Sequence, residues 1–365
     1  MKVAFDHRIF AQQRYGGISR YFFELASRLP NDAVTEVSII APLHLNGYLG
    51  ADSAAGVVRG RYVPYTYKRT ANVVDLVNRF AVPLAWRRMD PDIVHETYYA
   101  AKPVGKGRRR VVTIHDMIYE LFADEFPDAK RVTAAKRAAV NRADHVICVS
   151  ETTRCDLVRL FNVDPVRTSV VHHGYAMTTG MGNAAAETGK RRPTLLYVGK
   201  RLGYKNFGSF LQAYARSPVL RDFELIAFGG DPPMPHERQE IARLGLTGNV
   251  RFDSGSDRKL AAHYREATAF VYPSRYEGFG IPTLEAMSHG CPVVCSNAGA
   301  IPEVVGDAGL YFDPDDTDEL GATLERVATT EALRADLRTR GFTRLATFSW
   351  DKCAAATAQV YREIV

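Results

Sequence analysis

Short apolar runs alternate with amphipathic stretches along the whole chain, and this alternation limits the folds that the chain can adopt. Most of the runs are continuous and rich in β-branched residues, which is typical of strands buried on both faces of a parallel sheet. The strand candidates centre on Ala4, Ile39, Val94, Val112, Ile147 and Val170, and then on Leu196, Ile226, Phe252, Val271, Val294 and Tyr311. Helices are predicted between them, for example over Gly17–Leu29, Ala129–Ala143, Asn206–Ala215 and Pro282–Ser288. Repeated strand–helix–strand units predict doubly wound α/β sheets.

The two halves of the chain repeat this pattern, which predicts two Rossmann-like domains. We place the first over residues 1–180 and the second over residues 191–347, followed by a C-terminal helix over residues 349–365 that packs back on the first domain. Thr178–Pro193 is small, polar and non-periodic, which is typical of a linker. Ligands favour the carboxyl ends of parallel strands, so we expect a binding cleft between the two sheets.

Composition excludes several classes of protein. The 365 residues are 46% hydrophobic and 24% charged, which does not fit a disordered chain, a coiled coil or a collagen-like repeat. No apolar run reaches the roughly 18 residues of a membrane span, and MKVAFDHRIF lacks the apolar stretch of a signal peptide. The five cysteines are few and odd in number. We therefore expect a reduced, cytoplasmic protein.

The positive charge is concentrated in the first half. Residues 1–190 hold 26 basic and 19 acidic side chains, a net of +7, whereas residues 191–365 hold 21 and 22, a net of −1. The segment Lys68–Arg88 mixes basic and apolar residues and is interrupted by Pro83. It fits an interfacial segment that lies on anionic lipid at the inner face of the plasma membrane, and it equally fits a core-packing helix with a basic outer face.

The strongest motif is RYEGFGIPTLEAMSHGCPVV, Arg275–Val294. A strand leads into a glycine-bearing loop and then into a helix whose first turn holds Pro282, where a missing N–H group matters little. The free N–H groups at a helix start favour an anion such as phosphate. Glu277 and Glu285 flank this point, and a carboxylate can accept hydrogen bonds from adjacent sugar hydroxyls. The alternative is a buried loop with a helix-capping glutamate.

A second motif, LLYVGKRLGYKNF, places Lys200, Arg201 and Lys205 after a buried strand. Arginine offers a fork of donors to phosphate oxygens and lysine offers a point charge. A departing diphosphate needs such neutralisation, although an ordinary basic turn would have the same sequence. No D-x-D motif lies near these segments, so we predict no metal and no other cofactor.

Two weaker motifs lie in the first half. Gly16 and Gly17 precede a helix and would let a phosphate or a sugar approach the backbone, although the sequence is not the G-x-G-x-x-G of nicotinamide-binding proteins. His115 follows the strand VVTI, and a lone histidine near a core is more often structural than functional.

Together these motifs resemble glycosyltransferase family 4, whose members are retaining enzymes with the GT-B fold that use nucleotide sugars. The resemblance extends over nearly the whole chain and is most specific at the E-x7-E pair, Glu277 and Glu285. It implies that Glu285 holds the nucleotide ribose and that Glu277 contacts the donor sugar. It also assigns Phe279, Gly280 and Ile281 to the donor, the first two through backbone N–H groups.

The resemblance assigns the remaining candidates as well. Arg201 and Lys205 would bind the diphosphate, and Lys200 stands where many members carry arginine. His115 would touch the donor sugar from the first domain, and Gly17, preceded by Gly16, would lie beside the diphosphate and the acceptor.

The implied reaction is retaining hexosyl transfer without a protein nucleophile, in which positioning and charge stabilisation at the phosphates supply the rate. The sequence is most similar to mannosyltransferase-like members that build bacterial surface polysaccharides (O-antigen, capsule or exopolysaccharide). The expected partners are a nucleotide sugar and a saccharide or polyprenyl-linked saccharide acceptor, and not nucleic acid. Two alternatives stay open: a nucleotide-sugar epimerase on the same fold, and a non-catalytic nucleotide-binding scaffold.

Overall fold

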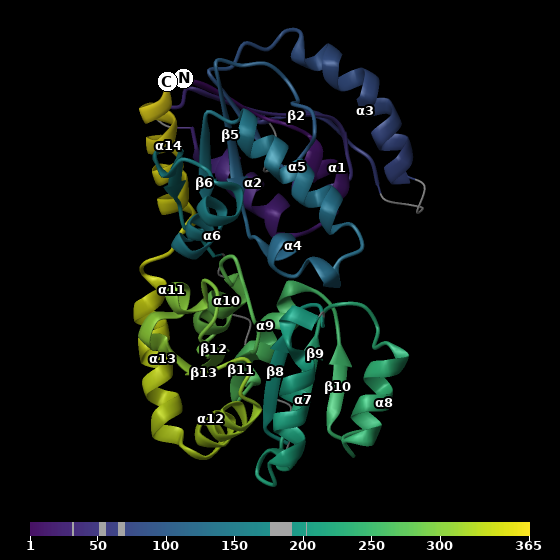
Figure 1. The fold of residues 1–365 in the computed structure, drawn as a ribbon, viewed down its shortest axis with the longest axis vertical. Helices are drawn as coiled ribbons and strands as arrows, with labels where there is room; N and C mark the ends of the chain where they lie inside the picture. Colours follow the sequence, from purple (N-terminus) through teal and green to yellow (C-terminus); the bar gives the residue numbers. More distant parts are fainter. Residues whose placement is uncertain (31–32, 51–55, 65–69, 176–191, 202) are drawn as a thin grey trace. The chain divides into compact units, whose positions relative to one another are not determined.

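The computed structural model of the chain describes residues 1–30, 33–50, 56–64, 70–175, 192–201 and 203–365. These residues form two compact units, Met1–Gly174 with Trp350–Val365, and Tyr175–Ser349 (Figure 1). We call them unit 1 and unit 2. Most of the predicted linker lies outside the described residues. None of the described helices combines the length and the apolar content that a membrane crossing needs.

Unit 1 is built on a seven-stranded sheet in which all neighbouring strands are parallel, in the order β3-β2-β1-β4-β5-β6-β7. Its strands are β1 (Lys2–Phe5), β2 (Glu36–His44), β3 (Val58–Tyr62), β4 (Ile93–Glu96), β5 (Arg109–Ile114), β6 (His145–Cys148) and β7 (Thr168–Val170). Its helices are α1 (Arg8–Gln12), α2 (Gly17–Arg28), α3 (Thr70–Trp86), α4 (Ile118–Leu121), α5 (Ala129–Arg142), α6 (Glu151–Phe161) and α14 (Trp350–Ile364).

Unit 2 holds a six-stranded parallel sheet in the order β10-β9-β8-β11-β12-β13. Its strands are β8 (Thr194–Val198), β9 (Glu224–Phe228), β10 (Val250–Asp253), β11 (Ala269–Tyr272), β12 (Val293–Ser296) and β13 (Gly309–Phe312). Its helices are α7 (Phe207–Arg216), α8 (Pro235–Arg243), α9 (Asp257–Glu266), α10 (Ile281–Ser288), α11 (Ile301–Val305), α12 (Thr317–Thr329) and α13 (Glu331–Leu345). The predicted doubly wound sheets are confirmed in both units.

Strand β3 is the one element of the two sheets that the apolar pattern did not predict. Its sequence is VRGRY, and none of its residues is buried, because β3 forms an edge of the sheet. The strand passes so close to β2 that a Cβ atom on Gly60 would lie 1.6 Å from the carbonyl oxygen of Ala41. Only glycine fits there, beside the irregular register between Ala41 and Leu43.

Helix α14 belongs to unit 1 and packs against α2. Its apolar stripe follows the predicted helical spacing, and Thr357, the polar position within the stripe, is buried. The Thr357 hydroxyl donates to the carbonyl of Cys353 at 2.8 Å, so its burial leaves no unsatisfied group. Further along the helix, the Tyr361 hydroxyl hydrogen bonds to Nδ1 of His95 at 2.6 Å.

Each sheet reverses its strand order at one point, where parallel sheets commonly bind ligands. In unit 2 the chain winds one way from β8 to β9 and the other way from β11 to β12; in unit 1 the corresponding strands are β1 and β4. At such a point the loops that follow the two central strands separate and leave a crevice at the carboxyl edge of the sheet. The two strongest sequence motifs follow β8 and β11.

Candidate functional site

The loop after β11 turns directly into helix α10 as predicted. Gly280 has φ +99°, a left-handed conformation that glycine adopts without strain, and it caps the helix that begins at Ile281. Pro282 occupies the first turn, where no N–H group is needed. Phe279 is buried, and its ring packs edge-on against Phe348 at a centroid distance of 5.7 Å. The loop is therefore anchored within unit 2 directly before the helix start.

Glu277 and Lys205, 72 residues apart in the sequence, are in contact. Lys205 ends a short 3₁₀ turn (Gly203–Lys205) after β8, and its Nζ lies 2.5 Å from Oε1 of Glu277. Both side chains are largely buried, with 15% and 9% of their side-chain surface exposed. The neighbouring strands β8 and β11 thus bring a cation and a carboxylate from two separate motifs to one point.

Tyr272, at the end of β11, lies beside this pair. Its side chain is buried beside Glu277. Burial, and then the charge of Glu277, raise the pKa of Tyr272 well above its usual value, so the hydroxyl is protonated at physiological pH. The Lys205 ammonium lies 5.4 Å from the Tyr272 ring centroid and 5.2 Å from that of Tyr204. The aromatic rings of Tyr272 and Tyr204 thus surround the cation of the pair.

Gly299, a glycine outside the predicted motifs, supports the backbone of Glu277. Gly299 has φ +59°, and a Cβ atom added to it would lie 2.7 Å from the nitrogen and 2.9 Å from the oxygen of Glu277. Ala300 donates its N–H group to the Glu277 carbonyl at 3.0 Å. The segment between β12 and α11 therefore fixes the position of the catalytic candidate. The turn-forming N-A-G sequence was the only signal for this role in the sequence.

The three cations after β8 differ in their surroundings. Lys200 is exposed, whereas the Arg201 side chain is 5% exposed. Arg201 binds Glu237 of α8 at 2.6 Å and donates to the carbonyls of Gly229 and Asp231 at 3.2 and 2.6 Å. These contacts hold Arg201 against the start of α8, just as Lys205 is held by Glu277. The binding of diphosphate by Arg201 and Lys205 stays a prediction.

Glu285 lies one turn into α10 and is half-buried. Its charge contributes, after burial, to raising the pKa of Tyr264 well above the usual value. Tyr264 donates its hydroxyl to the carbonyl of Pro282 at 3.3 Å, in the first turn of the same helix. Glu285 thus lies on the short helix that Gly280 caps and Ile281 begins. Its contact with a ribose stays a prediction.

In unit 1, Gly16 and Gly17 lie at the start of α2 and differ in their surroundings. A Cβ atom on Gly16 would lie 2.3 Å from Oε1 of Gln13, which accepts from the Ser19 N–H group at 3.3 Å. By contrast, no atom lies within 4 Å of the position that a Cβ atom on Gly17 would occupy. The space beside Gly17 is open for a ligand.

Gly17→Ala should therefore impair the approach of a ligand without impairing the stability of the fold. We expect unchanged stability, or a gain of up to about 1 kcal/mol from the higher helix propensity of alanine. We expect the transfer rate to fall about tenfold or more, because a methyl group would displace the reacting groups. Steady-state kinetics and thermal unfolding check both values. Gly248→Ala, where the added methyl also meets nothing within 4 Å, is the matched control, and an unaltered rate in Gly17→Ala would contradict the predicted contact.

His115 follows β5 and lies in a cluster of rings. It stacks on His173 with centroids 5.6 Å apart and planes within 6°, and Tyr21 packs edge-on against it at 5.2 Å. Its Nε2 is buried and has no hydrogen-bond partner among the described residues. Burial, and then the neighbouring imidazoles of His173 and His95, lower the pKa of His115 well below its usual value. The ring is therefore neutral at physiological pH, and its contact with the donor sugar stays a prediction.

The buried histidines of unit 1 make its stability sensitive to acid. Burial lowers the pKa of both His95 and His173 to about 3. The unfolded chain takes up protons near pH 6.5 and the folded chain does not, so this stability is present above pH 6.5 and is lost progressively towards pH 3. At pH 5 the loss is about 2 kcal/mol for each such imidazole. Urea unfolding followed by circular dichroism at pH 8 and pH 5 measures it. His236, which is exposed on α8, gives the control His236→Gln, and equal unfolding free energies at the two pH values would contradict the account.

Comparison with known proteins identifies the class. Residues 183–344 match the family model "Glycosyl transferases group 1", and residues 15–178 match "Glycosyltransferase Family 4". The chain is 33% identical to O-antigen chain mannosyltransferase B of Escherichia coli over 70% of each chain. It is 34% identical to an MMP α-(1→4)-mannosyltransferase of Mycolicibacterium hassiacum, over 79% of this chain and 74% of the relative.

Solved structures agree on the fold. The chain resembles sucrose-phosphate synthase of Thermosynechococcus elongatus with a TM-score of 0.74 at 18% identity, over 99% of this chain and 98% of that one. It resembles Anabaena HepE, solved with UDP and glucose, with a TM-score of 0.72 at 18% identity over the full length of both. Two parallel doubly wound units with these relatives define a GT-B glycosyltransferase. The chain belongs to glycosyltransferase family 4, and it is an enzyme of the hexosyltransferase class.

Proposed function

We propose that the enzyme is a retaining transferase that moves a hexose, specifically mannose, from a nucleotide diphosphate sugar to a saccharide or lipid-linked saccharide in surface-polysaccharide synthesis. The observation that carries the proposal is the contact between Lys205 and Glu277 at the strand-order reversal of unit 2, directly before the start of α10. The names of the two mannosyltransferase relatives support the choice of sugar. They also favour transfer over epimerisation and over a non-catalytic scaffold.

The proposed chemistry uses the residues in distinct roles. Lys200, Arg201 and Lys205 supply positive charge to the diphosphate, and the free N–H groups at the start of α10 donate hydrogen bonds to it. Glu277, paired with Lys205, accepts hydrogen bonds from hydroxyls of the donor sugar. Glu285 accepts hydrogen bonds from the ribose hydroxyls. His115 of unit 1 contacts the sugar as a neutral imidazole.

In the transfer step the bond between the sugar C1 and the diphosphate oxygen breaks while C1 bonds to the acceptor oxygen on the same face. The acceptor hydroxyl gives its proton to a departing phosphate oxygen, so no protein base is needed. The cations stabilise the charge that grows on the leaving group, and this is where most of the rate acceleration arises.

We further propose that lysine side chains replace a metal at the diphosphate. The described residues contain no group of three or more histidine, cysteine or acidic side chains placed to hold an ion. Removing divalent ions with a chelator should leave the transfer rate within about twofold of its starting value. Adding magnesium or manganese back to dialysed enzyme is the companion measurement. A rate that collapses with chelator and returns with one ion would contradict the proposal.

The direct test of function is a transfer assay with a panel of nucleotide sugars and mannose-containing acceptors. We expect one mannose nucleotide to be consumed with stoichiometric release of nucleoside diphosphate. Nuclear magnetic resonance of the product should show an anomeric configuration equal to that of the donor. An inverted product would contradict the retaining mechanism. Conversion of the donor to an epimer without any acceptor would instead support the epimerase.

A peripheral contact with anionic membrane is also proposed, and helix α3 supports it. Its inner face packs through Val74, Val82 and Trp86, as the core-packing interpretation predicted. Its outer face, however, presents a row of exposed apolar side chains as well as Arg79, and the exposed Arg87 and Arg88 follow directly after the helix. This apolar row consists of Val73, Leu76, Val77, Phe80 and Leu84, which are 40% to 66% exposed. Flotation with liposomes that contain anionic lipid, compared with neutral ones, tests the contact; absence of binding to both would remove it.

A further inference from the structure

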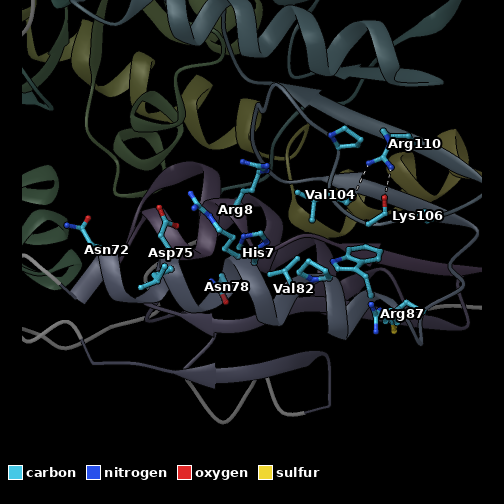
Figure 2. Close-up of a pocket in the computed structure, with 17 residues that line it drawn as sticks. His7, Arg8, Asn72, Asp75, Asn78, Val82, Arg87, Val104, Lys106 and Arg110 are labelled. Carbon is cyan, nitrogen blue, oxygen red and sulfur yellow. Dashed lines mark hydrogen bonds between the residues drawn. The ribbon is translucent and has the colours of Figure 1, made fainter.

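A groove of about 1350 Å³ runs along α3 in unit 1, between this helix, the start of α1 and segment 103–106 (Figure 2). None of the predicted donor-site residues lines it. Its walls come from three segments that are far apart in the sequence, and its lining is both cationic and apolar. The groove is therefore separate from the donor-site candidates, and it has no assigned ligand.

The walls of the groove are held in place by specific contacts. Asn78, in the middle of α3, donates to the carbonyl of Leu43 at 2.9 Å and accepts from its N–H group at 3.1 Å, which fixes the helix to β2. At the other end, Gly105 has φ +70° and lies so close to Trp86 that a Cβ atom would be 2.4 Å from the indole ring. These contacts indicate a formed groove rather than loose packing, and formed pockets are typical of ligand sites.

Two side chains of the groove lining carry buried donors without a partner among the residues that the structure describes. They are Nε1 of Trp86, a residue that is 7% exposed, and Nε of Arg8. Because these two nitrogen atoms are themselves buried, the groups that can meet a ligand are the exposed cationic side chains of the groove.

Charge indicates what kind of ligand this is. Arg79, Arg87 and Lys106 line the groove, and within the described part of the chain none of them forms an ion pair, whereas Arg110 is held by Glu96 at 2.7 Å. Among the described residues of the lining, Asp75 is the one acidic side chain. Figure 2 shows the cations distributed along the groove, from Arg8 to Arg87 and Lys106. An excess of cations without ion pairs favours a phosphate-bearing ligand.

The apolar part of the lining indicates that the phosphate carries a hydrocarbon chain. Leu76 belongs both to the groove and to the apolar row, and Val82 and Pro83 continue the apolar wall. We propose that the groove binds the diphosphate of a polyprenyl-diphosphate carrier, with the isoprenoid chain lying along the apolar row of α3. This inference rests on the proposed function, because it makes the acceptor of that reaction a lipid-linked saccharide.

Trp86 offers a direct test, because the chain has two tryptophans and the other, Trp350, is buried elsewhere in the core of unit 1. In Trp350→Phe, farnesyl diphosphate below its micelle concentration should change the Trp86 emission in a saturable way. Farnesol and pyrophosphate should each bind about tenfold or more weakly, because each offers half of the ligand. If Trp350→Phe does not fold, the same titration is carried out on the wild type and on Trp86→Phe. We expect the wild type to give the emission change and Trp86→Phe to lack it.

Charge variants and a second ligand complete the experiment. Arg79→Gln combined with Arg87→Gln should raise the Kd for farnesyl diphosphate about tenfold or more, and the matched control Arg258→Gln on α9 should not. Absence of a saturable signal, or pyrophosphate binding as tightly as farnesyl diphosphate, would overturn the inference. Nucleoside diphosphate binding by the same variants is measured in parallel. If neither the wild type nor any variant binds a nucleoside diphosphate, the proposed function is contradicted. If they bind the nucleoside diphosphate but not farnesyl diphosphate, only the proposed role of the groove is contradicted.

Discussion

Lys205→Ala should lower the rate of sugar transfer about 10²–10³-fold, the usual effect of removing one group that stabilises charge in a transition state. The ammonium of Lys205 lies at the strand-order reversal of unit 2, where it meets the carboxylate of Glu277 at 2.5 Å. The variant loses the cation that faces the diphosphate and also releases Glu277 from its partner. Transfer kinetics at saturating donor, with circular dichroism to confirm the fold, measure the effect.

The matched control is Arg243→Ala, which breaks an ion pair of similar length, 2.6 Å to Glu240 on the exposed face of α8. Surface pairs of this kind contribute about 0–1 kcal/mol, so we expect both the rate and the stability to stay near wild type. Lys200→Ala removes a second cation that forms no ion pair among the described residues, and it should slow transfer without loss of stability. A folded Lys205→Ala enzyme with the wild-type rate would show that the site is elsewhere.

Among substitutions of glycine by alanine in unit 2, Gly299→Ala should lower stability and transfer rate the most. The residue has φ +59°, and the new Cβ atom would lie within 3 Å of two backbone atoms of Glu277, which cannot rotate away as a side chain can. We expect stability to fall by about 2–4 kcal/mol, from steric overlap added to the strain of a left-handed alanine. Transfer should fall about 10²-fold or more even where the protein is folded, because Glu277 is displaced.

Gly321→Ala is the control for this substitution. Gly321 lies within α12, and the nearest atom to its added Cβ is the carbonyl oxygen of Ala213 at 3.9 Å. There alanine should stabilise the protein by up to about 1 kcal/mol through helix propensity. Thermal unfolding and transfer rates of the two variants are compared side by side. If Gly299→Ala behaved like Gly321→Ala, the close support of Glu277 would be contradicted.

The sequence predicted most of the sheet strands because strands buried on both faces consist of continuous apolar runs. β8 and β11 have this character, and their central residues are fully or almost fully buried. β3 was missed because an edge strand with no buried residue carries no such signal. Helix α3 continues through Pro83, where the sequence suggested an interruption. The pattern fitted both a core-packing helix and an interfacial one, and α3 has features of both, with a buried inner face and an exposed apolar row.

The candidate site was predictable as far as motif residues determine it. The E-x7-E motif and the cations after β8 could be read from local sequence, and the sheet brings Glu277 and Lys205 together. The partner of Arg201 could not be predicted, since Glu237 follows 36 residues later and no local pattern connects the two. The contact of Tyr272 with Glu277 and the close approach of Gly299 depend on how loops pack, which spacing in the sequence does not reveal.

Calorimetric titration of UDP, GDP and ADP into the wild-type enzyme and into Glu285→Ala tests the central claim most directly. The claim is that the loops after β8 and β11, with the start of α10, hold a nucleoside diphosphate. We predict that at least one of the three binds with one site per chain, and that Glu285→Ala weakens it about tenfold or more by removing the ribose acceptor. Failure of all three to bind the wild type, or equal affinity in the variant, would contradict the account.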